Sequence, residues 1–114
     1  MERLSFASAA ARPPSDPRLE HVTVAPLARG PSIQAAVFRL GPGGCIRRHP
    51  AAAAQLLAVT EGSGWVSAAD GNEEPITSGE AVFWEEGEEH ETWTDGGLAA
   101  VVIEGAGISA FRPS

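Results

Sequence analysis

Several features that would place this chain in a common protein class are scarce or missing. It has a single cysteine, Cys45, and so neither an internal disulfide nor the paired cysteines of a zinc or redox motif. No run approaches about 18 consecutive apolar residues, and Met1 to Ala11 has no apolar core of the length that a secretory signal needs. We therefore expect a soluble, cytoplasmic protein with no membrane partner.

Basic charge is also scarce. The 8 Lys and Arg residues are outnumbered by 15 Asp and Glu residues, which gives a formal net charge of −7, and Arg47-Arg48 is the only basic cluster. A chain of this charge is repelled by a phosphate backbone unless a local basic patch overrides the repulsion. We therefore predict that nucleic acid is not a partner.

Familiar catalytic motifs are absent as well. The chain has no G-x-S-x-G nucleophile elbow and no P-loop. We interpret Cys45 as a small buried hydrophobe, since nothing beyond a shared strand face links it to a histidine base. The catalytic residues, if there are any, stay unknown at this point.

The chain does contain short apolar runs separated by glycine. The 13 glycines fall largely in turn-like clusters such as Gly41 to Gly44 and Asp95 to Gly97. The runs between them cover residues 22–27, 33–40, 55–60, 65–69, 81–84, 89–94 and 98–104. Many short strands that end in turn residues are typical of an all-β sandwich or barrel.

The length of 114 residues is that of one domain with one core. We predict that residues 21–114 form the barrel. Residues 1–20 are rich in alanine and proline and offer little to bury, so we predict an N-terminal arm that is loose or docks as an extra strand. Pro50 followed by four alanines leaves open a helical turn at Ala51 to Ala54.

Two glycine-framed segments each hold one histidine at a fixed spacing. Gly43, His49, Gln55 and Gly62 follow the pattern G-x5-H-x5-Q-x6-G, and Gly79, Gly87 and His90 follow G-x7-G-x2-H. These segments resemble the two motifs of the cupin superfamily, G-x5-H-x-H-x3,4-E-x6-G and G-x5-P-x-G-x2-H-x3-N, over roughly residues 32–105. The resemblance implies a double-stranded β-helix, that is, a jelly-roll barrel of two antiparallel sheets.

The departures from these motifs bear on the chemistry. Ala51 stands in place of the second histidine, Gln55 in place of the glutamate, Glu85 in place of the proline and Thr94 in place of the asparagine. The resemblance implies a divalent transition metal (Zn, Fe, Mn, Ni, Co or Cu), and the residues that map onto its ligands are His49, Gln55 and His90. Three neutral ligands leave the charge of the ion uncompensated, so we expect weakened affinity and open coordination positions.

Strand alternation suggests further residues of the pocket. Counting by twos from His49 places Arg47 on its face, and counting from His90 places Thr92 and Thr94 there. These three are our predicted ligand-binding residues. Arg47 would attract an anionic organic ligand, although a solvated arginine at a strand end is the alternative. The acidic run from Glu85 to Glu91 is interpreted as a solvated rim.

We therefore predict a small cupin that binds a transition metal and a small anionic organic ligand, acting as an oxygenase or isomerase. The alternatives are a metal-free binding or sensor module, whose two histidines are merely hydrogen-bonded, and a protein kept for its interaction surface. Strands that are apolar on both faces, such as residues 32–40, predict a homodimer. Trp65, Trp84 and Trp93 fit core, interface or ligand-stacking roles alike.

Overall fold

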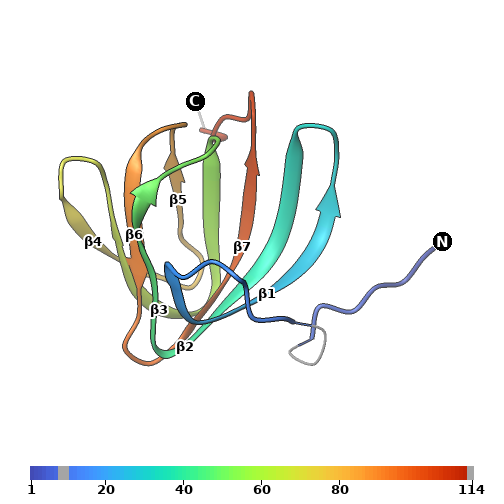
Figure 1. Cartoon of the computed structure of the whole chain (residues 1–114), viewed down its shortest axis with the longest axis horizontal. Helices are drawn as coiled ribbons and strands as arrows, with labels where there is room; N and C mark the ends of the chain where they lie inside the picture. The colour runs from blue at the N-terminus through green and yellow to red at the C-terminus, as the bar shows by residue number, and fades with distance from the viewer. Residues whose placement is uncertain (8–10, 113–114) are drawn as a thin grey trace.

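The computed structural model describes residues 1–7 and 11–112. Within these residues the chain forms only strands, all paired antiparallel (Figure 1). They are β1 (Leu19–Arg29), β2 (Ile33–Pro50), β3 (Gln55–Ser67), β4 (Glu73–Thr77), β5 (Ala81–Trp84), β6 (Glu89–Trp93) and β7 (Leu98–Gly105). Among the described residues there is thus no helix of the length and apolar character that crossing a membrane requires.

The long strands β2 and β3 close the barrel, because each pairs with both β6 and β7. Residues 33–40 of β2 pair with β7 and residues 45–50 pair with β6. In the same way β3 pairs with β7 through residues 55–62 and with β6 through residues 65–67. β1 extends the sheet beside β2, while β4 and β5 pair with β3. The predicted all-β jelly-roll barrel is confirmed.

The N-terminal arm joins the barrel at one point before β1 begins. Arg12 and Val24 exchange two backbone hydrogen bonds of 3.0 and 2.8 Å, an isolated bridge beside the first strand. Residues 1–7 have no strand structure and extend away from the barrel (Figure 1). Strand β1 starts at Leu19, within the predicted arm of residues 1–20. Residues 8–10 of that arm and 113–114 of the predicted barrel lie outside the described residues.

Two glycine-containing segments that separate predicted apolar runs lie inside long strands. Residues 41–44 do not interrupt β2, and residues 62–64 do not interrupt β3. The glycines allow bends that other residues would resist: a Cβ on Gly44 would lie 2.8 Å from the Gly41 carbonyl oxygen. The chain therefore bends at these positions and continues from one pairing partner to the next.

The alanine tract and the region after β3 also differ from simple sequence expectations. Ala51 to Ala54 form a bend, and no helical turn occurs there, because backbone bonds tie the segment to neighbouring chains. The Ala51 nitrogen donates to Glu88 O at 3.0 Å, and the Gly105 nitrogen donates to Ala54 O at 3.0 Å. Strand β4 was not among the predicted apolar runs. Its one buried residue is Ile76, so its sequence has no apolar run to detect.

The hydrophobic core fills the barrel between these strands. Trp84 is its largest fully buried side chain, and its indole nitrogen donates to Ser67 O at 3.1 Å. The other core residues come from β1, β2, β3, β4 and β7. They are Val22, Leu40, Ile46, Leu57, Val59, Val66, Ile76, Leu98, Ala100 and Val102. This core supports the inner face on which the two histidines lie.

Candidate functional site

A cavity of about 350 Å³ opens inside the barrel and collects most of the predicted site residues. Its lining includes His49 from β2, Gln55 from β3 and both His90 and Thr92 from β6. Apolar residues of β1, β2, β3 and β7 form the rest of its inner wall. Two segments about 40 residues apart in the sequence therefore place their histidines in one cavity.

The two imidazoles lie side by side. His49 and His90 are paired across β2 and β6, and their ring centroids are 4.5 Å apart with the planes tilted by 52°. Each Nδ1 lies close to a carbonyl oxygen two residues earlier in its own strand: Arg47 O at 2.6 Å for His49 and Glu88 O at 3.1 Å for His90. A neutral ring that donates through Nδ1 keeps its Nε2 lone pair free to accept a proton or a metal ion.

The surroundings of His90 favour the neutral form of its ring. It is 2% exposed, and the Trp84 ring packs against it with centroids 4.5 Å apart. Burial lowers the pKa of His90, and the neighbouring His49 lowers it further, while the bond to Glu88 O opposes the shift. The neutral form is the one that can bind a metal ion or accept a hydrogen bond through Nε2.

A row of polar side chains borders the cavity beside the histidines. Glu104 on β7 lies between Gln34 on β2 and Gln55 on β3 in the strand register. Its carboxylate accepts a hydrogen bond from Gln55 Nε2 at 3.1 Å and another from Gln34 Nε2. Because the amide nitrogen of Gln55 is held by Glu104, its carbonyl oxygen is left free for another partner.

Sequence reasoning missed Glu104, although a signal was present. It is the one charged residue in the apolar strand β7 and lies in register with Gln55. Arg18 was missed too, because it precedes β1 and only the fold brings it to the cavity. Asp16, also at the cavity, binds Arg18 at 2.7 Å, and this hydrogen bonding lowers the pKa of Asp16 to about 2.

Arg47 does not lie where strand alternation placed it. It is exposed, forms an ion pair with Glu20 and is not part of the cavity lining. The pairing of β2 with β6 is irregular between Ile46 and His49, and this β-bulge breaks the simple alternation. As a result Ile46, paired with Thr92, faces inward in place of Arg47.

The two threonines have different surroundings. Thr92 is 1% exposed and lines the cavity. Thr94 is equally buried, but its hydroxyl donates to Ser63 O at 2.7 Å and accepts from Gly97 N at 2.9 Å, away from the cavity lining. The geometry of Thr94 is that of a residue that holds the β6–β7 turn.

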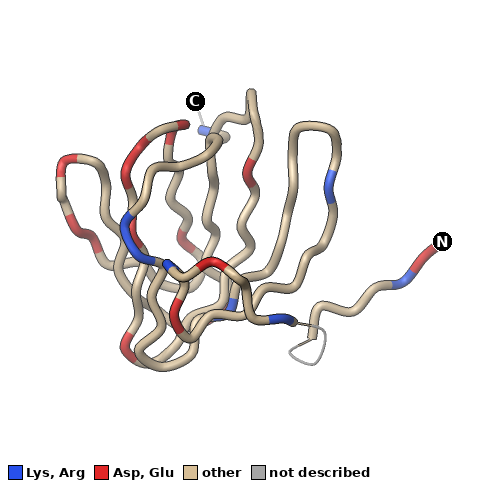
Figure 2. Tube along the Cα trace, in the orientation of Figure 1, with Lys and Arg blue, Asp and Glu red and all other residues tan. Residues whose placement is uncertain are grey.

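The remaining singled-out residues lie outside the cavity. Cys45 is half-buried, and burial, with the nearby Glu91 carboxylate, raises the pKa of its thiol. Trp65 and Trp93 stack on each other with centroids 6.2 Å apart. Figure 2 shows the acidic residues of the β5–β6 turn and of β4 along one side of the molecule, as a solvated rim would lie.

The donors at the cavity can be compared with what a transition metal needs. Among residues 1–7 and 11–112, no group of three or more His, Cys, Asp and Glu side chains could hold a metal ion. The available donors are the two Nε2 atoms and the Gln55 carbonyl oxygen. A ring centre lies about 3.2 Å from an ion bound at 2.0–2.1 Å, so two rings in adjacent positions lie about 4.5–5 Å apart. The observed 4.5 Å fits this arrangement. In ligand chemistry and ring spacing, His49, His90 and Gln55 match a neutral, incomplete ligand set for a metal ion.

Comparisons with known proteins agree with this geometry. Residues 41–111 match the family model of the AraC-like ligand binding domain. A comparison with curated proteins finds no sequence match. Both histidines, Gln55 and Glu104 lie within the matched residues.

Solved structures share the fold at low sequence identity. A polyketide cyclase from Streptomyces resistomycificus superposes with a TM-score of 0.82 at 23% identity, covering 92% of this chain and 79% of that one. An RmlC-like cupin from Shewanella frigidimarina gives a TM-score of 0.74 at 17% identity over 92% and 91% of the two chains. A cupin superfamily protein from Desulfitobacterium hafniense gives 0.73 at 14% identity over 93% of both chains.

The family model covers well over half of the chain, and the barrel is that of the cupin structures. The chain therefore belongs to the AraC-like ligand binding domain family and is a small member of the cupin superfamily.

Proposed function

We propose that this protein binds a small organic ligand in the barrel cavity, and that His49, Gln55 and His90 hold a divalent transition metal that receives an oxygen of the ligand. The observation that carries the proposal is the pair of adjacent imidazoles whose Nδ1 atoms are both engaged by backbone carbonyls. Two lone pairs on one cavity wall call for a cation or an acidic proton between them and the ligand.

Each residue has a distinct part in this proposal. The backbone bonds at Nδ1 orient the two rings, in the way that outer partners orient metal-bound histidines. Glu104 holds the nitrogen of Gln55, which turns the amide oxygen toward the remaining space. Trp84 excludes water behind His90. A bound metal would act as a Lewis acid for an oxyanion or enolate.

The residues around the cavity also indicate the class of ligand. A carboxylate, Glu104, lies close to the histidines, so a bound metal would strengthen the binding of an anionic ligand by supplying positive charge. Arg18 at the rim is already paired with Asp16, so it offers reduced attraction. One protein of the same fold is named a polyketide cyclase, and this name supports an organic substrate for the cavity proposed here. If the bound metal also catalyses a reaction of the ligand, we propose that the protein is an isomerase or an oxygenase.

A second candidate is binding of an acidic or hydroxylated ligand without metal. It is favoured by the absence of a three-membered His, Cys, Asp and Glu cluster among the described residues. In this case the ligand hydroxyl would donate to an imidazole Nε2, and the protein would be a binding or sensor module.

Metal content separates the two candidates. After EDTA treatment and reloading with Co²⁺ or Zn²⁺, we expect close to one ion per chain by elemental analysis, and at least a tenfold loss of affinity in His90→Ala. Gln55→Glu should bind the ion more tightly, since it adds a negative ligand charge. His21→Asn is the matched control, because His21 is exposed and outside the cavity.

Wild-type protein that takes up no ion, or a His90→Ala variant with unchanged affinity, would contradict the metal. The second candidate is then supported if salicylic acid, a hydroxylated acid probe, raises the Tm in the presence of EDTA and loses this effect in His90→Ala. If the wild-type protein binds no metal ion and salicylic acid does not raise its Tm, both the metal-dependent and the metal-free candidate functions are wrong.

We also propose a homodimer. Ile33 at the start of β2 is 43% exposed and Phe111 near the C-terminus is 94% exposed, which leaves apolar side chains available for a second chain. The second apolar face of β2 is already covered within one chain, since Val37 on that face is 5% exposed. Sedimentation equilibrium should give twice the chain mass of 11.8 kDa, with Phe111→Ser shifting it toward the monomer. A monomeric wild type at high micromolar concentration would contradict the dimer.

A further inference from the structure

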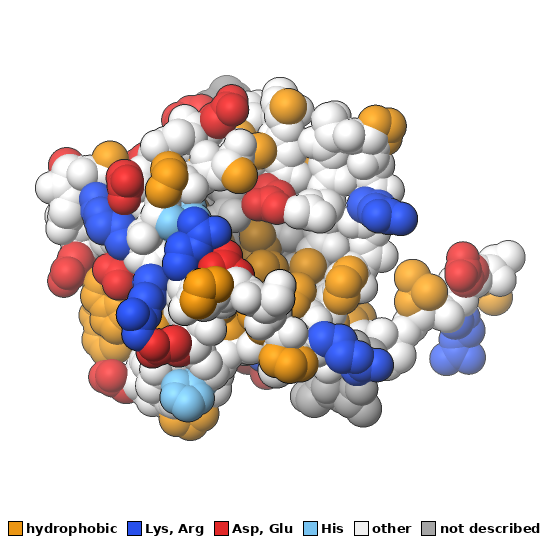
Figure 3. All heavy atoms as spheres, in the orientation of Figure 1, with side chains coloured by type: hydrophobic (Ala, Val, Ile, Leu, Met, Phe, Trp, Pro, Cys, Tyr) orange, Lys and Arg blue, Asp and Glu red, His pale blue; other side chains and the backbone are white. Residues whose placement is uncertain are grey.

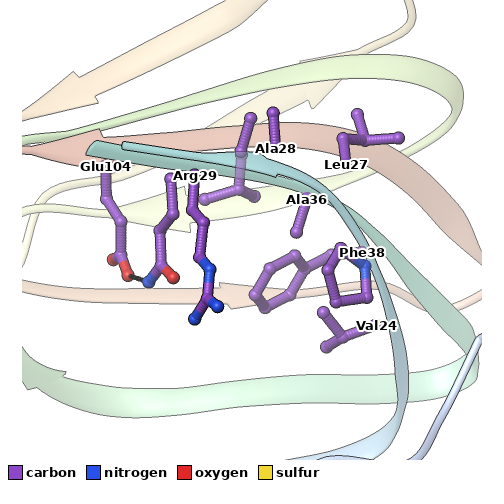
Figure 4. Close-up of a pocket in the computed structure, with 11 residues that line it drawn as sticks. Val24, Leu27, Ala28, Arg29, Ala36, Phe38 and Glu104 are labelled. Carbon is purple, nitrogen blue, oxygen red and sulfur yellow. Dashed lines mark hydrogen bonds between the residues drawn. The ribbon is translucent and has the colours of Figure 1, made fainter. Parts of the chain in front are cut away.

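A second hollow continues the cavity toward the turn that joins β1 to β2. Its volume is about 480 Å³, and it lies between β1, β2 and β7 (Figure 4). Val24, Phe38, Val102 and Glu104 line both hollows, so the two meet at these side chains. Figure 3 shows hydrophobic side chains gathered in a hollow on this face of the molecule. We call the second hollow the outer groove.

Strand register explains how the outer groove and the inner cavity form one surface. Pro26, Ala36, Val102 and Leu57 are successive partners across β1, β2, β7 and β3. Pro26 and Ala36 line the outer groove, Leu57 lines the inner cavity, and Val102 lines both. This apolar row therefore runs without interruption from the groove to the histidines.

A polar row follows the apolar row across the same four strands. Its members, in register order, are Arg29, Gln34, Glu104 and Gln55. Figure 4 shows Arg29 and Glu104 at one end of the groove and Phe38 and Val24 at the other. The Glu104 carboxylate is engaged by two amides, so its charge is partly satisfied before any ligand binds. The channel is thus apolar along one long edge and polar along the other.

A small side chain, that of Ala36, leaves space in the outer groove. Ala36 stands on the face of β2 that also carries Phe38, where a β-branched or larger residue commonly fills a half-buried strand. Ala36 is half-buried and points to the same side as the Phe38 ring (Figure 4). A larger side chain at Ala36 would occupy the groove without touching either histidine, because Ala36 lines only the outer hollow.

We propose that the inner cavity and the outer groove form one channel for an elongated, mostly apolar molecule with a single acidic or enolic oxygen at its head. The head would bind at His49 and His90, and the apolar body would extend past Phe38 into the groove. Four strands lie across the channel, and three strand spacings of about 4.8 Å give a ligand length of about 14 Å. The inference rests on the proposed ligand site and names the substrate class for it.

A pair of straight-chain acids tests the channel. Hexanoic acid fills only the inner cavity, whereas extended dodecanoic acid matches the channel length. By isothermal titration calorimetry, wild-type protein should bind dodecanoic acid at least tenfold more tightly than hexanoic acid. Each additional methylene that becomes buried can raise the affinity by at most about fourfold. Ala36→Leu should weaken dodecanoic acid at least tenfold and change hexanoic acid less than twofold.

Three variants make this experiment decisive. Ala81→Leu, at the exposed start of β5, is the matched control and should bind both acids as the wild type does. Ala36→Val introduces a smaller obstruction if Ala36→Leu fails to fold. His90→Ala should weaken both acids equally, because it removes the binding group for the head.

The outcomes separate this inference from the proposed function. If His90→Ala leaves both affinities unchanged while Ala36→Leu weakens only the longer acid, the channel stands and the head-group site is wrong. Equal affinities of the two acids in the wild type, no binding of either acid, or loss of both in Ala36→Leu would overturn the channel. A change of oligomeric state in Ala36→Leu with unchanged acid binding would assign the groove to a second copy of the chain.

Discussion

Trp84→Ala should lower the free energy of unfolding by about 3–5 kcal/mol, among the largest losses that a single substitution can cause here. Trp84 is 1% exposed and is the largest fully buried side chain. Its removal leaves a cavity between the core and His90, and it deprives Ser67 O of its indole donor. Urea unfolding followed by far-ultraviolet circular dichroism measures the loss.

Two comparisons identify the source of this effect. Trp84→Phe keeps most of the apolar volume and loses the N–H donor, so it should cost about 1–3 kcal/mol. Trp65→Ala is a partial control. Trp65 is half-buried and stacks on Trp93, so this substitution should lower the free energy of unfolding less than Trp84→Ala does. Equal losses of unfolding free energy in Trp84→Ala and Trp65→Ala would contradict a core role for Trp84.

The second large effect is expected at Gly62, a motif glycine with a φ of 75°. The left-handed backbone conformation alone should cost about 1–3 kcal/mol in Gly62→Ala. A Cβ at this position would also overlap the carbonyl group of Gly97, a backbone group that cannot rotate away, and would lie 3.0 Å from Leu98 Cα. Overpacking of this kind adds about 1–3 kcal/mol.

Gly71→Ala separates the two costs. Gly71 has a φ of 81°, but a Cβ there would have no atom within 4 Å. The difference between the two variants in the free energy of unfolding therefore reports the contact with Gly97. Equal losses would show that the barrel moves aside at no cost, which would contradict a closely packed junction between β3 and β7.

The fold could be predicted because glycine placement and short apolar runs are local signals. The runs at 81–84 and 98–104 correspond closely to β5 and β7. The sequence did not show that β2 continues through Gly41 to Gly44, since a glycine cluster is compatible with a turn or with a bend inside a strand. Strand β4 has one buried residue, Ile76, so it offers little periodicity to detect.

The candidate site was predicted where it depends on motif spacing and missed where it depends on long-range pairing. His49, Gln55 and His90 line one cavity, as their spacing indicated. The bulge between Ile46 and His49 moved Arg47 outside, and a one-residue irregularity of this kind has no sequence signature here. Glu104 reaches Gln55 only because β7 pairs with β3, a contact between residues 49 positions apart.

The way in which β7 links β2 and β3 has a consequence for biogenesis. During synthesis, β2 and β3 leave the ribosome before Leu98 to Gly105. Until β7 is made, both strands have an unpaired edge on the side that β7 later occupies. Native structure with such non-local pairing forms slowly, on the millisecond-to-second scale. The nascent chain therefore depends on its late-made strand to protect it from self-association, and a stop codon just before that strand would leave an aggregation-prone fragment.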